Sequence, residues 1–264
     1  MAAAMSYPIR YSSGAHDTAG RRYLFVICHQ RSFSSLLCHI LGSHPEIDGY
    51  TETHSSYTGR IDLRRLDARV RQMTKAPLSG RYVLDKILDT YQFLSSDLLA
   101  RPEVSVLFLV RNARDTIASI IDMYARLEHL AREGEIRLSE PPGALEYYSL
   151  RLRQIEAYSA QRQSDTLFIE AERLIDDTAS VLDGIARWLQ LGEPLSSSYH
   201  TFELTGVQGH CDTSASIKTG RLVKDSEERH RAYAPTTIPN EILRRGEAAY
   251  AQCRDALLRW RLPD

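Results

Sequence analysis

The stretch that decides the fold reads YLFVICHQRSFSSLL and spans residues 23–37. It begins with an unbroken apolar run, which is typical of a strand covered on both faces of a sheet. A cation, several serines and then leucines at helical spacing follow this run. The first turn of a helix presents unpaired N–H groups and the positive end of the helix dipole. The sequence therefore predicts an anion-binding site between a strand at 23–28 and a helix at 34–41.

A second stretch repeats this arrangement further along the chain. It reads VSVLFLVRNARDTIAS, residues 104–119, and places Arg111 directly after an apolar run and Ser119 eight residues later. The serines of the first stretch could by themselves do no more than cap a helix. Two such turns in one α/β protein instead predict a ligand that carries two separated anionic ends.

Composition places the chain among ordinary globular proteins. It has 264 residues, of which 43% are hydrophobic and 25% charged, and its net charge is −1. That charge gives no overall attraction toward nucleic acid or an anionic membrane, and no segment resembles a membrane span or a signal peptide. The four cysteines form no CxxC pair. We therefore expect a reduced, cytoplasmic protein.

The pattern along the rest of the chain predicts alternating strands and helices. Further strands are expected at 82–84, 104–110 and 166–169, and helices at 61–73, 91–99, 115–127, 144–162, 181–189 and 241–259. This order favours a single α/β domain over residues 21–264, with a central, mostly parallel sheet flanked by helices; the resemblance described next implies that this domain is P-loop-like. Residues 1–20 are expected to be a flexible N-terminal segment. The polar stretch 196–233 is expected to be irregular and to fold over a site.

The first turn resembles the first nucleotide-binding motif of sulfotransferases that use 3′-phosphoadenosine 5′-phosphosulfate (PAPS). That motif is a Lys or Arg, a small residue, Gly and two hydroxyl residues. The resemblance implies that a run of six residues binds the 5′-phosphosulfate, namely Arg31, Ser32, Phe33, Ser34, Ser35 and Leu36. Phe33 stands where the family has glycine, so it must adopt that backbone conformation. Its ring is expected to wall the acceptor side.

Two further segments extend the resemblance. The family's second motif has an Arg at a strand end and a Ser eight residues later, matched by Arg111 and Ser119, which implies contacts to the 3′-phosphate. A basic, glycine-containing segment that closes over the same phosphate resembles residues 218–221, which are Lys218, Thr219, Gly220 and Arg221. Glu172 matches the acidic residue of a Glu-Asp-Leu step, while Arg173 replaces its Asp.

The resemblance also proposes catalytic residues. Lys86 matches a family lysine near the sulfuryl group, although it could equally be a solvated lysine at a strand end. The family's cytosolic members have a histidine base two residues later, where this chain has Leu88. Counting from Arg31 without gaps places the alternative family base, a glutamate, on Glu52. His54 is the second candidate, because imidazole titrates near neutrality. Both could instead belong to an ordinary polar loop.

The expected activity is sulfuryl transfer from PAPS to a hydroxyl or amine of a small molecule or glycan. No nucleic-acid or membrane partner is expected, and a homodimer is left open. No metal is expected either, because the chain's histidines do not follow the spacing of a metal site. A P-loop kinase or nucleotide hydrolase is the alternative enzyme, although the chain lacks the Walker lysine. A nucleotide-binding protein without transfer activity is the third reading.

Overall fold

The computed structural model describes residues 20–127, 132–133, 136–207, 212–223 and 238–262. The predicted N-terminal segment, apart from Gly20, lies outside these residues. No described helix has the length and apolar character needed to cross a membrane.

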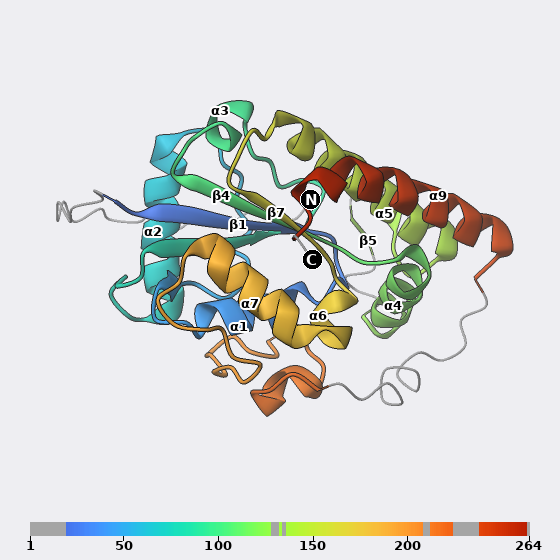
Figure 1. Ribbon diagram of the computed structural model, residues 1–264. Helices are drawn as coiled ribbons and strands as arrows, with labels where there is room; N and C mark the ends of the chain where they lie inside the picture. Colours follow the sequence, from blue (N-terminus) through green and yellow to red (C-terminus); the bar gives the residue numbers. More distant parts are fainter. Residues whose placement is uncertain (1–19, 128–131, 134–135, 208–211, 224–237, 263–264) are drawn as a thin grey trace, which may run out of the picture.

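A parallel five-stranded sheet forms the centre of the protein (Figure 1). Its strands, in spatial order, are β2 (Ile47–Asp48), β3 (Tyr82–Ile87), β1 (Arg22–Cys28), β4 (Val104–Val110) and β7 (Thr166–Glu170). Strands β1 and β4 are buried almost throughout, as their unbroken apolar runs predict. The chain passes from β1 to one side of the sheet and then returns to the other side as β4. Ligands bind at such a switch point, at the carboxyl ends of the strands.

Helices cover both faces of this sheet (Figure 1). One face packs against α2 (Arg60–Thr74), α3 (Ser96–Leu99), α4 (Ala113–Arg126), α5 (Pro141–Gln161) and α9 (Asn240–Leu257). The other face packs against α1 (Ser34–Gly42), α6 (Arg173–Asp176) and α7 (Thr178–Leu189). Short 3₁₀ turns at Ser216–Thr219 and Leu258–Trp260, and the antiparallel strands β5 (Arg132–Glu133) and β6 (Ile136–Arg137), complete the described elements. The predicted α/β class with a flanked parallel sheet is confirmed.

Two predicted elements differ from the structure in ways that have local causes. The helix expected at 91–99 is wrong, because only Ser96–Leu99 is helical. The Gln92 side chain instead accepts from the N–H groups of Leu88 and Asp89, and this holds the chain in a turn. Helix α5 begins at Pro141 and not after the Pro-Pro-Gly sequence. Proline suits the first turn of a helix, where its missing N–H costs nothing.

Strand β3 runs three residues further than its hydropathy predicts. Asp85, Lys86 and Ile87 continue the ladder with β1, where they pair with Phe25, Val26 and Ile27. Hydropathy cannot find this extension, because two of the three side chains are charged. Its consequence is that Lys86 is buried inside the sheet and is not a solvated lysine at a strand end.

Candidate functional site

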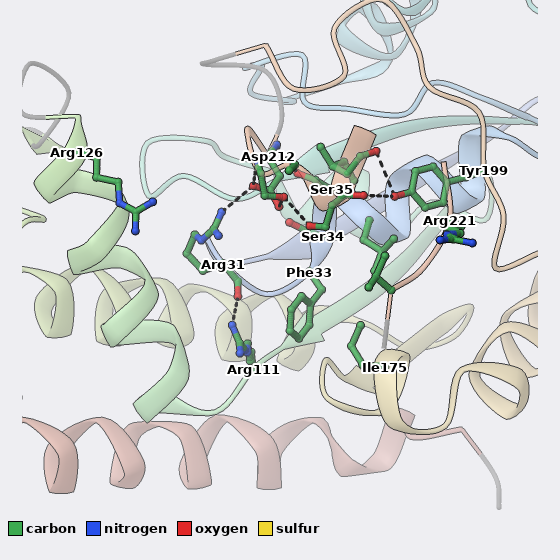
Figure 2. A pocket seen from close by; sticks show the side chains of 16 residues that line it. Arg31, Phe33, Ser34, Ser35, Arg111, Arg126, Ile175, Tyr199, Asp212 and Arg221 are labelled. Carbon is green, nitrogen blue, oxygen red and sulfur yellow. Dashed lines mark hydrogen bonds and ion pairs between the residues drawn. The ribbon is translucent and has the colours of Figure 1, made fainter. Parts of the chain in front are cut away.

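A cavity of about 360 Å³ opens at the carboxyl ends of β1 and β4, a size that suits a small-molecule ligand (Figure 2). It is lined by both predicted turns and by the irregular segment that follows α7; the lining includes Arg31, Phe33, Ser34, Ser35, Leu36, Arg111, Tyr199, Asp212, Ile217 and Arg221. Four arginines contribute to the lining, since Arg126 from α4 is the fourth, and Asp212 is the one carboxylate among the described lining residues. The lining is therefore rich in cationic side chains.

The turn between β1 and α1 leaves the start of α1 open. Arg31 and Phe33 both have left-handed backbones, with φ of 63° and 62°. Glycine adopts this conformation more easily, which agrees with the glycine that the resemblance expects at position 33. Phe33 occupies the N-cap position, and its ring has no acceptor with which to cap the helix. The first-turn N–H groups, which include those of Ser34 and Ser35, therefore remain suited to an anionic ligand.

The Arg31 guanidinium joins this turn to two other elements. Its Nε donates to the Ser119 hydroxyl of α4 over 2.7 Å, and its Nη1 forms an ion pair with Asp212 at 3.3 Å. The two serine–arginine motifs of the sequence thus meet directly. Ser32 has another role, because its buried hydroxyl donates to the His29 carbonyl and does not reach the cavity.

The turn between β4 and α4 is closed by its own side chains. Asn112 caps α4 by accepting from the Asp115 N–H at 2.9 Å, and Glu172 accepts from the Asn112 N–H at 2.9 Å. The buried Arg111 guanidinium donates to Asp115 and to the Arg31 carbonyl. It also lies 4.3 Å from the centre of the Phe33 ring. The ring lines the cavity as well as lying against Arg111, and its expected place on the acceptor side stays a prediction.

His29, which the sequence did not mark as part of the site, connects the two turns. Its Nε2 accepts from the Arg111 N–H at 2.9 Å, and its Nδ1 lies 2.8 Å from the Gln30 carbonyl oxygen. A carbonyl oxygen can only accept, so the ring is neutral with its proton on Nδ1. Burial lowers the pKa of His29 to about 3, which agrees with this protonation state.

Three buried side chains of helix α5 form hydrogen bonds with backbone groups at the strand ends. Arg151 donates to the carbonyl oxygens of Cys28 and Ile87, at 2.7 and 2.6 Å. The Tyr147 hydroxyl accepts from the Gln30 N–H and donates to the Leu88 carbonyl, while the Tyr148 hydroxyl donates to the Arg111 carbonyl. These bonds satisfy backbone groups at the ends of β1, β3 and β4. They fix the turns that carry the arginines.

Lys86 and Glu52 form a buried ion pair beside the cavity. The Lys86 Nζ lies 2.5 Å from the Glu52 carboxylate and 3.1 Å from the Ser35 hydroxyl. The Thr51 hydroxyl also donates to Glu52, at 3.0 Å. A buried charge pair is stable only with such added partners. The two residues that the sequence proposed separately, 34 positions apart, thus form one unit in contact with α1.

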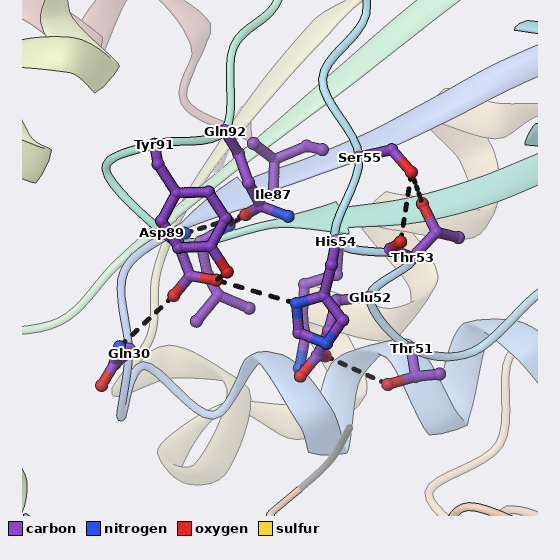
Figure 3. A network of polar contacts seen from close by, with 12 residues as sticks. Gln30, Thr51, Glu52, Thr53, His54, Ser55, Ile87, Asp89, Tyr91 and Gln92 are labelled. Carbon is purple, nitrogen blue, oxygen red and sulfur yellow. Dashed lines mark hydrogen bonds and ion pairs between the residues drawn. The ribbon is translucent and has the colours of Figure 1, made fainter. Parts of the chain in front are cut away.

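His54 belongs to a neighbouring polar network (Figure 3). Its Nδ1 lies 3.9 Å from the Asp89 carboxylate, which also accepts from the Tyr91 hydroxyl and from the Gln30 amide. Burial opposes the ionisation of Asp89, but the nearby His54 imidazole and the hydrogen bond from Tyr91 outweigh it and hold the pKa of that carboxyl below its usual range. His54 has a left-handed backbone with φ of 53°. Glu52 and His54, the two candidate bases, lie on the same loop.

Asp85 anchors this loop and was not identified from the sequence. Its fully buried carboxylate accepts from the Thr53 N–H and hydroxyl, from the Tyr57 hydroxyl at 2.6 Å and from the Lys86 N–H. Burial raises the pKa of Asp85 to about 6 despite these bonds. Thr53 lies between Glu52 and His54, so Asp85 fixes both candidate bases relative to the end of β3. The sequence signal that could have found Asp85 is an acidic residue next to Lys86, directly after the apolar run of β3.

The segment matched at 218–221 contributes one residue to the cavity. Arg221 lines it, whereas the Lys218 side chain lies against Gly206 and the Thr219 hydroxyl donates to backbone carbonyls. Gly220 has a φ of 68° and ends the 3₁₀ turn. The described part of the stretch 196–233 is irregular apart from this turn, and it folds over the cavity as expected.

The comparisons with known proteins rest on structure. No family model matches the chain, and no curated protein matches it. Among solved structures, the chain is similar to a sulfotransferase domain from the curacin biosynthetic pathway, with a TM-score of 0.52. The fold is sulfotransferase-like. The alignment covers 92% of this chain and 99% of that domain at 15% identity, so the likeness concerns the fold alone.

Proposed function

We propose that the protein transfers a sulfuryl group from PAPS to a hydroxyl or amine of a small-molecule or glycan acceptor. The observation that carries this proposal is the buried Lys86–Glu52 pair, which contacts Ser35 at the open start of α1. It joins an anion-binding helix end to a proton acceptor. The sulfotransferase-like fold supports the same reading.

The two turns would hold the two ends of the donor. The 5′-phosphosulfate fits the open turn, where Arg31 and the N–H groups of Ser34, Ser35 and Leu36 are the donors. The 3′-phosphate fits Arg111, which lines the same cavity. Ser119 reaches the donor indirectly, because its hydroxyl holds the Arg31 side chain. Arg221 closes the cavity from the segment above it.

The transfer would be an in-line displacement at sulfur. The acceptor oxygen or nitrogen forms a bond to sulfur while the bond from sulfur to the bridging phosphate oxygen breaks, and that electron pair leaves on adenosine 3′,5′-bisphosphate. The acceptor proton passes to the Glu52 carboxylate. Lys86 and Arg31 stabilise the charge that grows on the leaving oxygen. These cations suffice in principle without a divalent ion, because a sulfuryl group carries less charge than a terminal phosphate.

The proposal is tested by supplying PAPS with a panel of hydroxyl and amine acceptors. Mass spectrometry should detect a product heavier by one SO₃ group, together with stoichiometric adenosine 3′,5′-bisphosphate. Arg31→Ala should lower turnover more than it lowers affinity for the bisphosphate, since the charge that it meets grows in the transition state. Magnesium-dependent ATP turnover, or bisphosphate binding with no transfer to any acceptor, would instead favour a kinase or a non-catalytic binding protein.

A further inference from the structure

A carboxylate of the chain itself occupies the anion-binding end of the cavity (Figure 2). Asp212 Oδ1 lies 3.3 Å from Arg31 Nη1, and the Asp212 backbone N–H donates to the Ser35 hydroxyl at 3.2 Å. Asp212 thus contacts Arg31 and Ser35, two of the residues to which the preceding section assigns the phosphosulfate. Its side chain is 28% exposed, so the contact lies within the cavity wall and not on the open surface.

The Asp212 carboxylate is negatively charged at neutral pH. Burial alone would favour its neutral form, but the charge of Arg31 and the hydrogen bonds from Ser214 outweigh this and hold the pKa of Asp212 below its usual range. An oxyanion bound at Arg31 would lie close to the Asp212 carboxylate, and the two negative charges would repel each other in this partly buried site. A ligand oxyanion at Arg31 therefore competes with the carboxylate in its present position.

We infer that Asp212 acts as a built-in competitor that raises the ligand concentration needed to fill the anion site. Its carboxylate pairs with Arg31 at 3.3 Å, and an incoming oxyanion must displace it. This inference deepens the proposed function, because it names what the donor's phosphosulfate replaces. Because the competitor is attached to the site, its effective concentration is high, and it resists displacement by dilute inorganic anions.

The structure already contains the partners that Asp212 needs after displacement. Its Oδ1 accepts from the Ser214 N–H at 3.1 Å, and its Oδ2 accepts from the Ser214 hydroxyl at 3.0 Å. The carboxylate can therefore leave Arg31 without losing all its hydrogen bonds. A ligand that also binds Arg111 gains a second anchor, whereas free sulfate or phosphate does not. The competitor thus keeps single oxyanions out at concentrations at which a two-ended ligand still binds.

The test measures binding of two probes by calorimetry, inorganic sulfate and adenosine 3′,5′-bisphosphate, to the full chain and to Asp212→Asn. Removing the competitor should tighten both probes by the same factor, roughly tenfold, because both displace the same carboxylate. Asp183→Asn is the matched control, since it removes the same charge from an exposed ion pair on α7 and should change neither affinity. Asp212→Ser repeats the measurement with a different side chain and guards against a folding defect of one variant.

The two proposals fail in different ways. Unchanged or weaker sulfate binding in both Asp212 variants would overturn the competitor, whatever the nucleotide does. Tighter sulfate binding, with no bisphosphate binding in any variant, would retain the competitor and overturn the proposed donor. If Asp183→Asn raised the affinity for sulfate as much as Asp212→Asn does, the effect would come from the net charge of the protein. That result would also overturn the inference.

Discussion

The two strand-to-helix turns at the cavity begin from the same sequence pattern and end in opposite states. At the β1–α1 turn, the N-cap residue is Phe33, which offers no acceptor to the first turn of α1. At the β4–α4 turn, Asn112 caps the helix and Glu172 binds the Asn112 N–H. One helix start is open to a ligand, and the other is already satisfied by the chain's own side chains.

This difference separates two kinds of anion binding. An open helix start can offer several N–H groups and surround an oxyanion, which suits a group whose charge changes during a reaction. A closed start can offer only the cation that it holds in place, here Arg111, which suits an anchor that does not react. Lys86 and Glu52 lie beside the open turn through Ser35. We therefore expect chemistry at the first turn and positioning at the second.

Glu52→Gln should show the largest effect. The amide keeps the shape of the side chain but cannot accept the acceptor's proton, so turnover should fall by about two to four orders of magnitude. Steady-state kinetics with PAPS and calorimetry with the bisphosphate should show lost turnover and retained nucleotide binding. His54→Ala is the comparison variant: if it is inactive while Glu52→Gln remains active, His54 is the base and the assignment of Glu52 is wrong.

Arg111→Ala should have the next largest effect, and it should act on binding. It leaves the ligand's 3′-phosphate without its charged partner, so affinity for adenosine 3′,5′-bisphosphate should fall by roughly 2–4 kcal/mol. Affinity for adenosine 5′-phosphosulfate, which has no 3′-phosphate, should hardly change in the same titration. An equal loss for both nucleotides would show that Arg111 acts through the fold of the turn and does not discriminate the 3′ end.

The smallest effect concerns the open turn's backbone. Phe33→Gly and Phe33→Ala both remove the ring from Arg111, but only glycine relieves the left-handed φ of 62°. The glycine variant should therefore be more stable than the alanine variant by about 1 kcal/mol in urea unfolding. An alanine variant of equal or greater stability would mean that the turn is not strained at this position.

The strands that place the site follow from the sequence, because runs such as 104–110 are apolar on both faces and only a central strand of a covered sheet buries both. The start of α1 at Ser34 also follows, since serines after an arginine mark a helix start, but the absence of a side-chain cap at Phe33 is seen only in the structure. The extension of β3 to Ile87 does not follow, because Asp85 and Lys86 are polar and are accommodated only by tertiary partners. The helix expected at 91–99 is wrong for a similar reason, since the Gln92 side chain replaces backbone partners.

Within the site, the sequence identifies residues more readily than it identifies their partners. Glu52 and Lys86 are found as separate candidates, but their ion pair depends on the loop that Asp85 anchors. Asp212 was not found, because a single aspartate in a polar stretch carries no periodic or motif signal. Its meaning comes only from lying beside Arg31, 181 positions away in the chain.

The imidazole of His29 is a rigid link between the two turns of the site. One ring spans the gap between the two turns, with one nitrogen on the Arg111 backbone and the other on the Gln30 carbonyl. Because the pKa of His29 lies at about 3, the ring stays neutral throughout the neutral range, and its two hydrogen bonds keep the proton on Nδ1. The backbones of the two turns are therefore bridged by one rigid heterocycle whose charge does not change in that range. If the proposed donor binds both turns, the spacing of its two charged ends must match this fixed geometry.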